Sequence, residues 1–89
     1  MTVAQQVKAF GAKVTKVTRG MYTYNGKNFT VDFDNTCEID GYAWEVSLVS
    51  RKLPAELEEM LYDGNYFETK SDLVWLLLNV DQDCEQRKV

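Results

Sequence analysis

Two dipeptides, Asn25-Gly26 and Asp40-Gly41, constrain the fold of this 89-residue chain more than any other feature of its sequence. Both are favoured in two-residue type I′ hairpin turns, in which each central residue takes a positive φ. A turn at each dipeptide divides the stretch from Val17 to Val49 into three consecutive strands. The sequence therefore predicts a three-stranded antiparallel meander.

The pairing that these turns imply also places apolar side chains on one face. The first turn pairs Tyr22 with Phe29, and the second pairs Phe33 with Leu48. Because side chains alternate between the two faces, a one-residue slip in either hairpin would break this agreement. We therefore expect one buried sheet face, formed by Tyr22, Phe29, Val31, Phe33, Cys37, Ile39, Tyr42, Trp44, Val46 and Leu48.

Helical patterns lie on both sides of the meander. Val3, Val7 and Phe10 recur at helical spacing, which predicts a helix from Thr2 to about Ala12 with Thr2 as its cap. The first strand of the meander is expected to begin near Val14, after Gly11 and ahead of a run of β-branched residues.

Two more helices are expected after the meander. Pro54 suits the first position of one helix, and Gly64 suits the residue that follows its end. Thr69, with Asp72 three residues later, predicts the start of a last helix that ends near Val80 or one turn beyond. The chain is thus predicted to form one α+β domain over residues 1–89, in the order α-β-β-β-α-α, with the helices on one sheet face and a frayed tail at about 83–89.

The order of a helix, three strands and a helix resembles that of double-stranded RNA-binding domains, in topology only. That family has a basic stretch at the start of its last helix, whereas the segment Thr69-Lys70-Ser71-Asp72 holds one lysine and one acid. We therefore assign no RNA-binding residue from the resemblance.

Residue types argue against catalysis. The chain has no histidine, which removes the commonest general base and the usual zinc ligand. Cys37 and Cys84 have no basic cluster nearby in sequence that would lower a thiol pKa. Asp32, Asp34 and Glu38 lack the mid-loop glycine and distal glutamate of a calcium loop. We expect a protein that is not an enzyme and holds no metal or cofactor.

The cysteines and the length of the apolar runs indicate the cellular location of the protein. Two widely spaced cysteines do not form a disulfide framework, so reduced thiols are expected. The longest apolar run, Leu73 to Leu78, is too short to cross a bilayer, and the N-terminus has no apolar stretch of a signal peptide. These features predict a cytoplasmic protein without membrane contact.

The net charge of −4 conceals a strong asymmetry. Residues 1–31 hold five basic side chains and no acid, whereas residues 32–89 hold all 14 acids against five basic side chains. Either the two parts attract each other within the fold, or they form a bipolar surface that meets a charged partner.

Acidic side chains form the first candidate surface. Asp32, Asp34 and Glu38 alternate on the outer sheet face beside Glu45, and of these only Asp32 has an expected basic partner, Arg19. Rows of carboxylates can imitate phosphates on a basic protein groove. We expect a small acidic binding protein, of the kind found among phage and bacterial accessory proteins that inhibit a host protein at its nucleic-acid site. Its partner would contact Asp32, Asp34, Glu38, Glu45, Glu56, Glu59 and Asp63.

The alternative is a nucleic-acid-binding module. It would use the basic side chains of the N-terminal third, namely Lys8, Lys13, Lys16, Arg19 and Lys27.

The last helix is apolar on most of its sides. Leu73, Leu76, Leu77 and Val80 form one stripe, while Val74, Trp75 and Leu78 lie outside it. Two explanations are open. Either the N-terminal helix covers Trp75 and Leu78, or these three outer residues form the interface of a homodimer.

Overall fold

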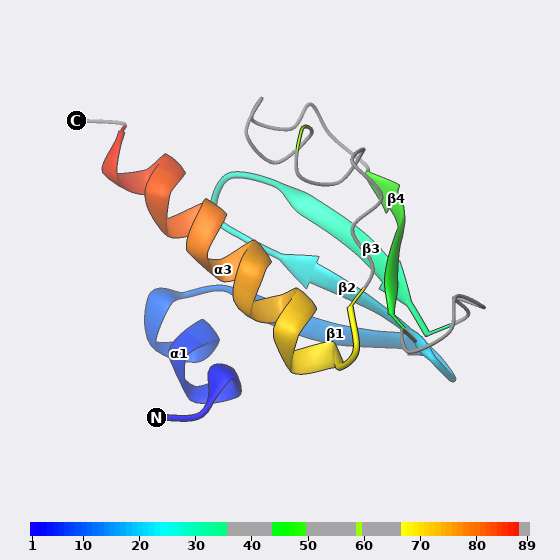
Figure 1. The fold of residues 1–89 in the computed structure, drawn as a ribbon. Coiled ribbons are helices and arrows are strands. Elements are labelled where there is room, and N and C mark those ends of the chain that lie inside the picture. The colour runs from blue at the N-terminus through cyan, green and yellow to red at the C-terminus, as the bar shows by residue number, and fades with distance from the viewer. Residues whose placement is uncertain (36–43, 50–58, 60–66, 88–89) are drawn as a thin grey trace.

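The computed structural model describes residues 1–35, 44–49, 59 and 67–87, with only the backbone of 45–49. The sheet is antiparallel, in the order β1-β2-β3-β4, and helices α1 and α3 lie on one of its faces (Figure 1). The elements are α1 (Val3–Phe10), β1 (Lys13–Thr18), β2 (Met21–Asn25), β3 (Thr30–Asp34), β4 (Glu45–Val49) and α3 (Lys70–Gln86).

The predicted α+β class and the antiparallel meander under helices on one face are confirmed, as β2, β3 and β4. The sheet also has a fourth strand, because the stretch predicted as the first strand folds back at Arg19-Gly20 into β1 and β2. Gly20 has a φ of 78°, in the left-handed region that glycine adopts without a steric penalty. The register shifts between Lys16 and Thr18, as in hairpins closed by a bulge.

The β2–β3 hairpin keeps the predicted faces but not the predicted register. Tyr22 pairs with Phe33 instead of Phe29, a displacement of four positions. An even displacement leaves every side chain on its original face. The strands are joined by a longer loop, which Gly26 N–H closes by donating to the Phe29 carbonyl oxygen at 3.0 Å. The type I′ turn predicted at Asn25-Gly26 is wrong, since the positive-φ glycines of the described residues are Gly11 and Gly20.

The β3–β4 pairing is also displaced from the prediction. Phe33 pairs with Val46 instead of Leu48, and a shift of register after Asp32 pairs Val31 with Val49. The predicted turn at Asp40-Gly41 lies outside the described residues, as does the predicted helix between Pro54 and Gly64 except for Glu59.

The core lies between the sheet and the helices. Phe29, Val31 and Phe33 are fully buried as predicted, and Tyr22 and Trp44 are half-buried. Tyr24 is also fully buried, although the predicted face omitted it. Of the other predicted core positions, Cys37, Ile39, Tyr42 and the side chains of Val46 and Leu48 lie outside the described part of the chain.

Helix α1 begins and ends with the groups that the sequence indicates. The Thr2 hydroxyl accepts from Gln5 N–H at 3.1 Å, and the Gln5 side chain accepts from Thr2 N–H at 2.9 Å. Gly11, with a φ of 95°, ends the helix near the predicted boundary at Ala12.

Helix α3 begins at the predicted cap, where the Thr69 hydroxyl accepts from Asp72 N–H at 3.1 Å. It continues to Gln86, so residues 83–86 are helical where a frayed tail was expected. Val74 and Leu78 are buried within the chain's own core, whereas Trp75 is 52% exposed. Intramolecular packing therefore accounts for Val74 and Leu78, and neither α1 nor another described element covers Trp75. No helix in the described ranges is long and apolar enough to cross a membrane.

Candidate functional site

A carboxylate is buried towards the C-terminal end of α3. Asp81 of α3 is fully buried and contacts the loop between β2 and β3. Its Oδ2 accepts from the Tyr24 hydroxyl at 2.8 Å and from Lys27 N–H at 2.9 Å. Its Oδ1 accepts from the N–H of Asn28 at 3.1 Å and from the Asn28 side-chain amide at 2.6 Å.

These four hydrogen bonds fill the acceptor capacity of a carboxylate, about four positions. The nitrogen of the Asn28 amide also lies 3.1 Å from the Asp81 carbonyl oxygen and 3.2 Å from Glu85 Oε2, so its two N–H groups are shared among three acceptors. Burial, the hydrogen bond to Asp81 and repulsion from its charge raise the pKa of Tyr24 far above its ordinary value. The arrangement stabilises the loop and leaves no oxygen of Asp81 free to act as a general base.

The predicted acidic surface is only partly described. Asp32 is half-buried and accepts from the Thr23 hydroxyl at 2.7 Å, so the predicted Arg19–Asp32 pair is wrong. The register causes this difference, because it places Thr23 across from Asp32 and Arg19 in the β1–β2 turn. Asp34 is 7% exposed, and the helical residue Glu59 is exposed. The side chains of Glu38, Glu45, Glu56 and Asp63 lie outside the described part.

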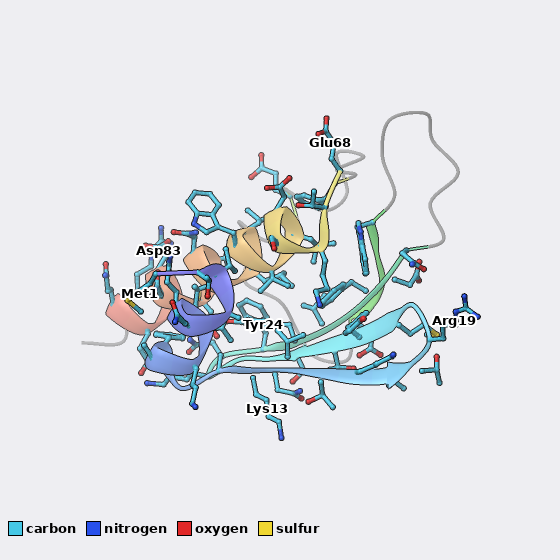
Figure 2. The ribbon with its side chains drawn as sticks, turned by 90° about the horizontal axis from the view of Figure 1, so that it is seen from below. Met1, Lys13, Arg19, Tyr24, Glu68 and Asp83 are labelled. Carbon is cyan, nitrogen blue, oxygen red and sulfur yellow. The ribbon has the colours of Figure 1, made fainter. Side chains whose placement is uncertain are left out.

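The basic side chains of the first 31 residues gather along one edge of the molecule. Strand β1 is an edge strand, α1 packs beside it, and Arg19 lies at the tip of the β1–β2 hairpin (Figure 2). All five side chains are exposed, and within the described ranges none of them forms an ion pair. Lys27 places its Nζ 4.8 Å from the centre of the Phe10 ring, which connects the β2–β3 loop to α1. We call Lys8, Lys13, Lys16, Arg19 and Lys27 the basic edge.

An apolar groove lies between α1, the start of β1 and the first turns of α3. Its volume is about 480 Å³, and none of its lining residues is acidic. We call it the α1–α3 groove. Its apolar lining consists of Val3, Ala4, Val7, Ala12, Val14 and Val74, and its polar lining of Lys8, Lys13, Lys70 and Ser71.

The strand register determines which lysines face this groove. Val14 pairs with Tyr24 and Lys16 pairs with Tyr22, so both lie on the helix side of β1. Lys13 borders the groove, but its side chain points away from the helices (Figure 2). Lys70 also lines the groove, and its Nζ lies 4.4 Å from the centre of the Tyr22 ring. Lys8 is therefore the remaining exposed cation that lines the groove, and Lys16 lies outside the lining, two residues beyond Val14 on the same face of β1.

The sequence did not predict this groove. Val74 was a candidate for a homodimer interface, and Lys70 had no predicted role. Both reach the groove only because α3 packs against α1, a contact between opposite ends of the chain. Asp81 gave no signal beyond being an acid within a largely apolar helix. In the part of the chain that the structure describes, no group of three or more acids or cysteines is placed to hold a metal ion.

Comparison with protein families, curated proteins and solved structures finds no match for this chain. The four-stranded sheet also departs from the three-stranded order of double-stranded RNA-binding domains. The site must therefore be interpreted from its own geometry.

Proposed function

We propose that this protein is a non-catalytic binding domain that recognises an acidic region of another protein through the basic edge. The observation that carries the proposal is the exposure of all five basic side chains on and beside an edge strand, in a stretch without acids. A surface of one charge sign speeds association with an oppositely charged partner and makes it sensitive to salt.

Features of the sheet favour a protein over a nucleic acid as the partner. Single-stranded nucleic acids are usually held by stacking their bases on exposed aromatic rings. Here Tyr24, Phe29 and Phe33 are fully buried under the helices. The large exposed apolar side chains near the basic edge are Val17 and Met21, at 58% and 41% exposure. Aliphatic side chains among lysines suit an acidic protein surface better than a row of bases.

The acidic surface is the second candidate. Glu59 is exposed and Asp32 is partly exposed, on a chain whose residues from 32 onward carry a strong excess of acid. A phage or bacterial accessory protein that occupies a host nucleic-acid site would use this surface. The burial of Asp34 weakens it, because a partner has little access to that carboxylate.

Affinity capture from a nuclease-treated bacterial lysate, followed by mass spectrometry, tests the proposal with two matched charge reversals. One variant carries Lys8→Glu and Lys13→Glu on the basic edge, and the other carries Asp32→Lys and Glu59→Lys. We expect a protein that wild type and the second variant retain and the first variant loses. Its retention should also weaken as salt rises.

Other outcomes would overturn the proposal. A protein lost only with Asp32→Lys, Glu59→Lys would locate binding on the acidic surface. Nucleic acid recovered without nuclease treatment, as the only material that depends on the basic edge, would support a nucleic-acid-binding module. Captured proteins that depend on neither set of charges would exclude both surfaces.

A further inference from the structure

We propose that the α1–α3 groove binds an acidic amphipathic peptide segment of the partner, with its apolar side chains in the groove and its carboxylates against Lys8 and Lys16. This inference rests on the proposed function, since it names the part of the partner that the basic edge recognises. The groove is then a recognition site for apolar side chains flanked by carboxylates.

The groove's lining selects apolar side chains. Val7, Ala12 and Val74 are buried and form its floor, and Val3 and Val14 are half-buried at its sides. The groove's volume of about 480 Å³ lies within the range of roughly 300–1,000 Å³ that is usual for ligand sites. Leucine-sized side chains entering it would remove aliphatic surface from water on both partners.

The positive charges around the groove favour a bound segment that carries carboxylates. Lys8 lies in the last turn of α1 and Lys16 lies on β1, two residues beyond Val14 on the same face. Their charges therefore lie on two separate elements, whereas the lining offers no acid to neutralise them. A peptide with carboxylates on both sides of its apolar residues would meet both lysines, as an amphipathic helix does when it lies in a groove.

Two synthetic peptides test the apolar requirement, Ac-EELLEELLEE-NH2 and Ac-EEAAEEAAEE-NH2, which have the same charge. Titration of the full-length protein is followed by NMR of its valine methyl groups. We expect the leucine peptide to shift the signals of Val7, Val14 and Val74 and to bind about tenfold more tightly than the alanine peptide. Equal binding of the two peptides, or shifts confined to residues outside the groove, would show that the groove is not the site.

A filling substitution tests the location. Ala4 is an exposed lining residue of α1, and Ala9 is an exposed residue of the same helix outside the lining. Ala4→Phe should weaken binding of the leucine peptide by about tenfold or more, whereas Ala9→Phe should leave it unchanged. The amide spectra of the two variants establish that both are folded. Similar effects of the two substitutions would contradict the assignment.

Charge reversal on the two faces of β1 tests the carboxylate contacts. Lys16→Glu and Lys13→Glu make the same change in net charge on one strand, the first on the helix side and the second on the opposite face (Figure 2). The expected loss of leucine-peptide affinity is about five- to tenfold for Lys16→Glu and less than about twofold for Lys13→Glu, at low salt. Equal losses would mean that only net charge attracts the peptide.

The groove and the basic edge can fail separately. If neither peptide binds but Lys8→Glu, Lys13→Glu still abolishes capture of the partner, the groove inference is wrong and the proposed function stands. If the leucine peptide binds in the groove but capture of the partner is insensitive to the basic edge, the proposed function is wrong. The groove then binds acidic amphipathic peptides, but the claim that such a peptide belongs to this partner is overturned.

Discussion

The two ends of helix α3 contact the rest of the molecule in opposite ways. Near its C-terminus, Asp81 is fully buried and joined by four hydrogen bonds to Tyr24 and to the loop between β2 and β3. Near its N-terminus, Lys70 and Val74 line a groove that remains open beside α1 and β1. The C-terminal end is filled, and both oxygens of Asp81 are paired, although Oδ1 of Asn28 is buried there without a hydrogen-bond partner among the described residues. The N-terminal end has apolar walls around an open groove.

We expect the C-terminal end of α3 to stabilise the fold and the N-terminal end to bind a partner. A buried carboxylate with all its acceptors engaged contributes to the fold, because removing it leaves several donors without partners. The exposed lining of an open groove, such as Ala4 and Lys8, contributes less to the fold because it contacts water, whereas the buried floor belongs to the core. Substitutions near Asp81 should therefore change the free energy of unfolding, and substitutions at the groove should change binding.

The largest effect is expected for Asp81→Ala. The substitution leaves the buried hydroxyl of Tyr24 and the partly buried donors of Lys27 and Asn28 without an acceptor, so the free energy of unfolding should fall by about 3–5 kcal/mol. Urea unfolding followed by circular dichroism measures it. Asp81→Asn, which keeps one acceptor oxygen, should lose less.

Asp83→Ala is the matched control on the same helix. Asp83 is exposed and pairs with Arg87 at 2.9 Å, so its loss should change the free energy of unfolding by less than about 1 kcal/mol. If Asp81→Ala lowered the free energy of unfolding no more than this control, the C-terminal end of α3 would not be the more stabilising end.

Gly26→Ala should have the second largest effect. A Cβ at this position would overlap Oδ2 of Asp81 and lie 2.6 Å from Cε1 of Tyr24, so the loop and the carboxylate must separate. We expect a loss of about 1–3 kcal/mol in urea unfolding, as for other overpacked sites. Lys27→Ala, which keeps the backbone donor to Asp81, should cost less than about 1 kcal/mol. A neutral Gly26→Ala would mean that the loop has room to move.

Tyr24→Phe tests the same network through pH. Removing the hydroxyl should cost about 1 kcal/mol at neutral pH. Because the pKa of Tyr24 is raised in the folded state, the unfolded chain releases this proton first as the pH passes about 10. Wild-type stability should then fall relative to Tyr24→Phe, by up to about 1.4 kcal/mol per pH unit. Urea unfolding between pH 7 and 11 measures this, and a constant gap between the two proteins would contradict it.

The buried face of each central strand and the order β2-β3-β4 were predictable, but the register of the residue pairs was not. Alternation placed Phe29, Val31 and Phe33 on the buried side, and an even displacement of register preserved that result. The register depends on loop length, which Asn25-Gly26 suggested to be two residues. The structure instead requires glycine at 26 for lack of space beside Asp81, not for a positive φ. Sequence alone does not distinguish these two reasons for a glycine.

Contacts between distant parts of the chain limited prediction of the candidate site. Asp81 is 54 positions from Lys27, and no local pattern connects an acid in a helix with the backbone of a hairpin loop. Likewise, the charge asymmetry identified the basic residues, but only the Arg19-Gly20 hairpin makes β1 an edge strand. That hairpin was missed because the residues from Val14 to Tyr24 also suit one continuous strand.

The smallest effect on stability is expected for Ala4→Phe, the counterpart of Gly26→Ala at the open end. Both substitutions add carbon atoms near α3, but the new ring at position 4 enters the groove instead of occupied space. The lower helix propensity of phenylalanine is offset by its contacts with the groove walls, so the free energy of unfolding should change by less than about 0.5 kcal/mol. Urea unfolding beside Ala9→Phe, which has the same propensity cost without the groove, measures the difference. A loss of more than about 1 kcal/mol for Ala4→Phe alone would show that the groove is too tightly packed to admit a side chain, and that the two ends of α3 do not differ as described.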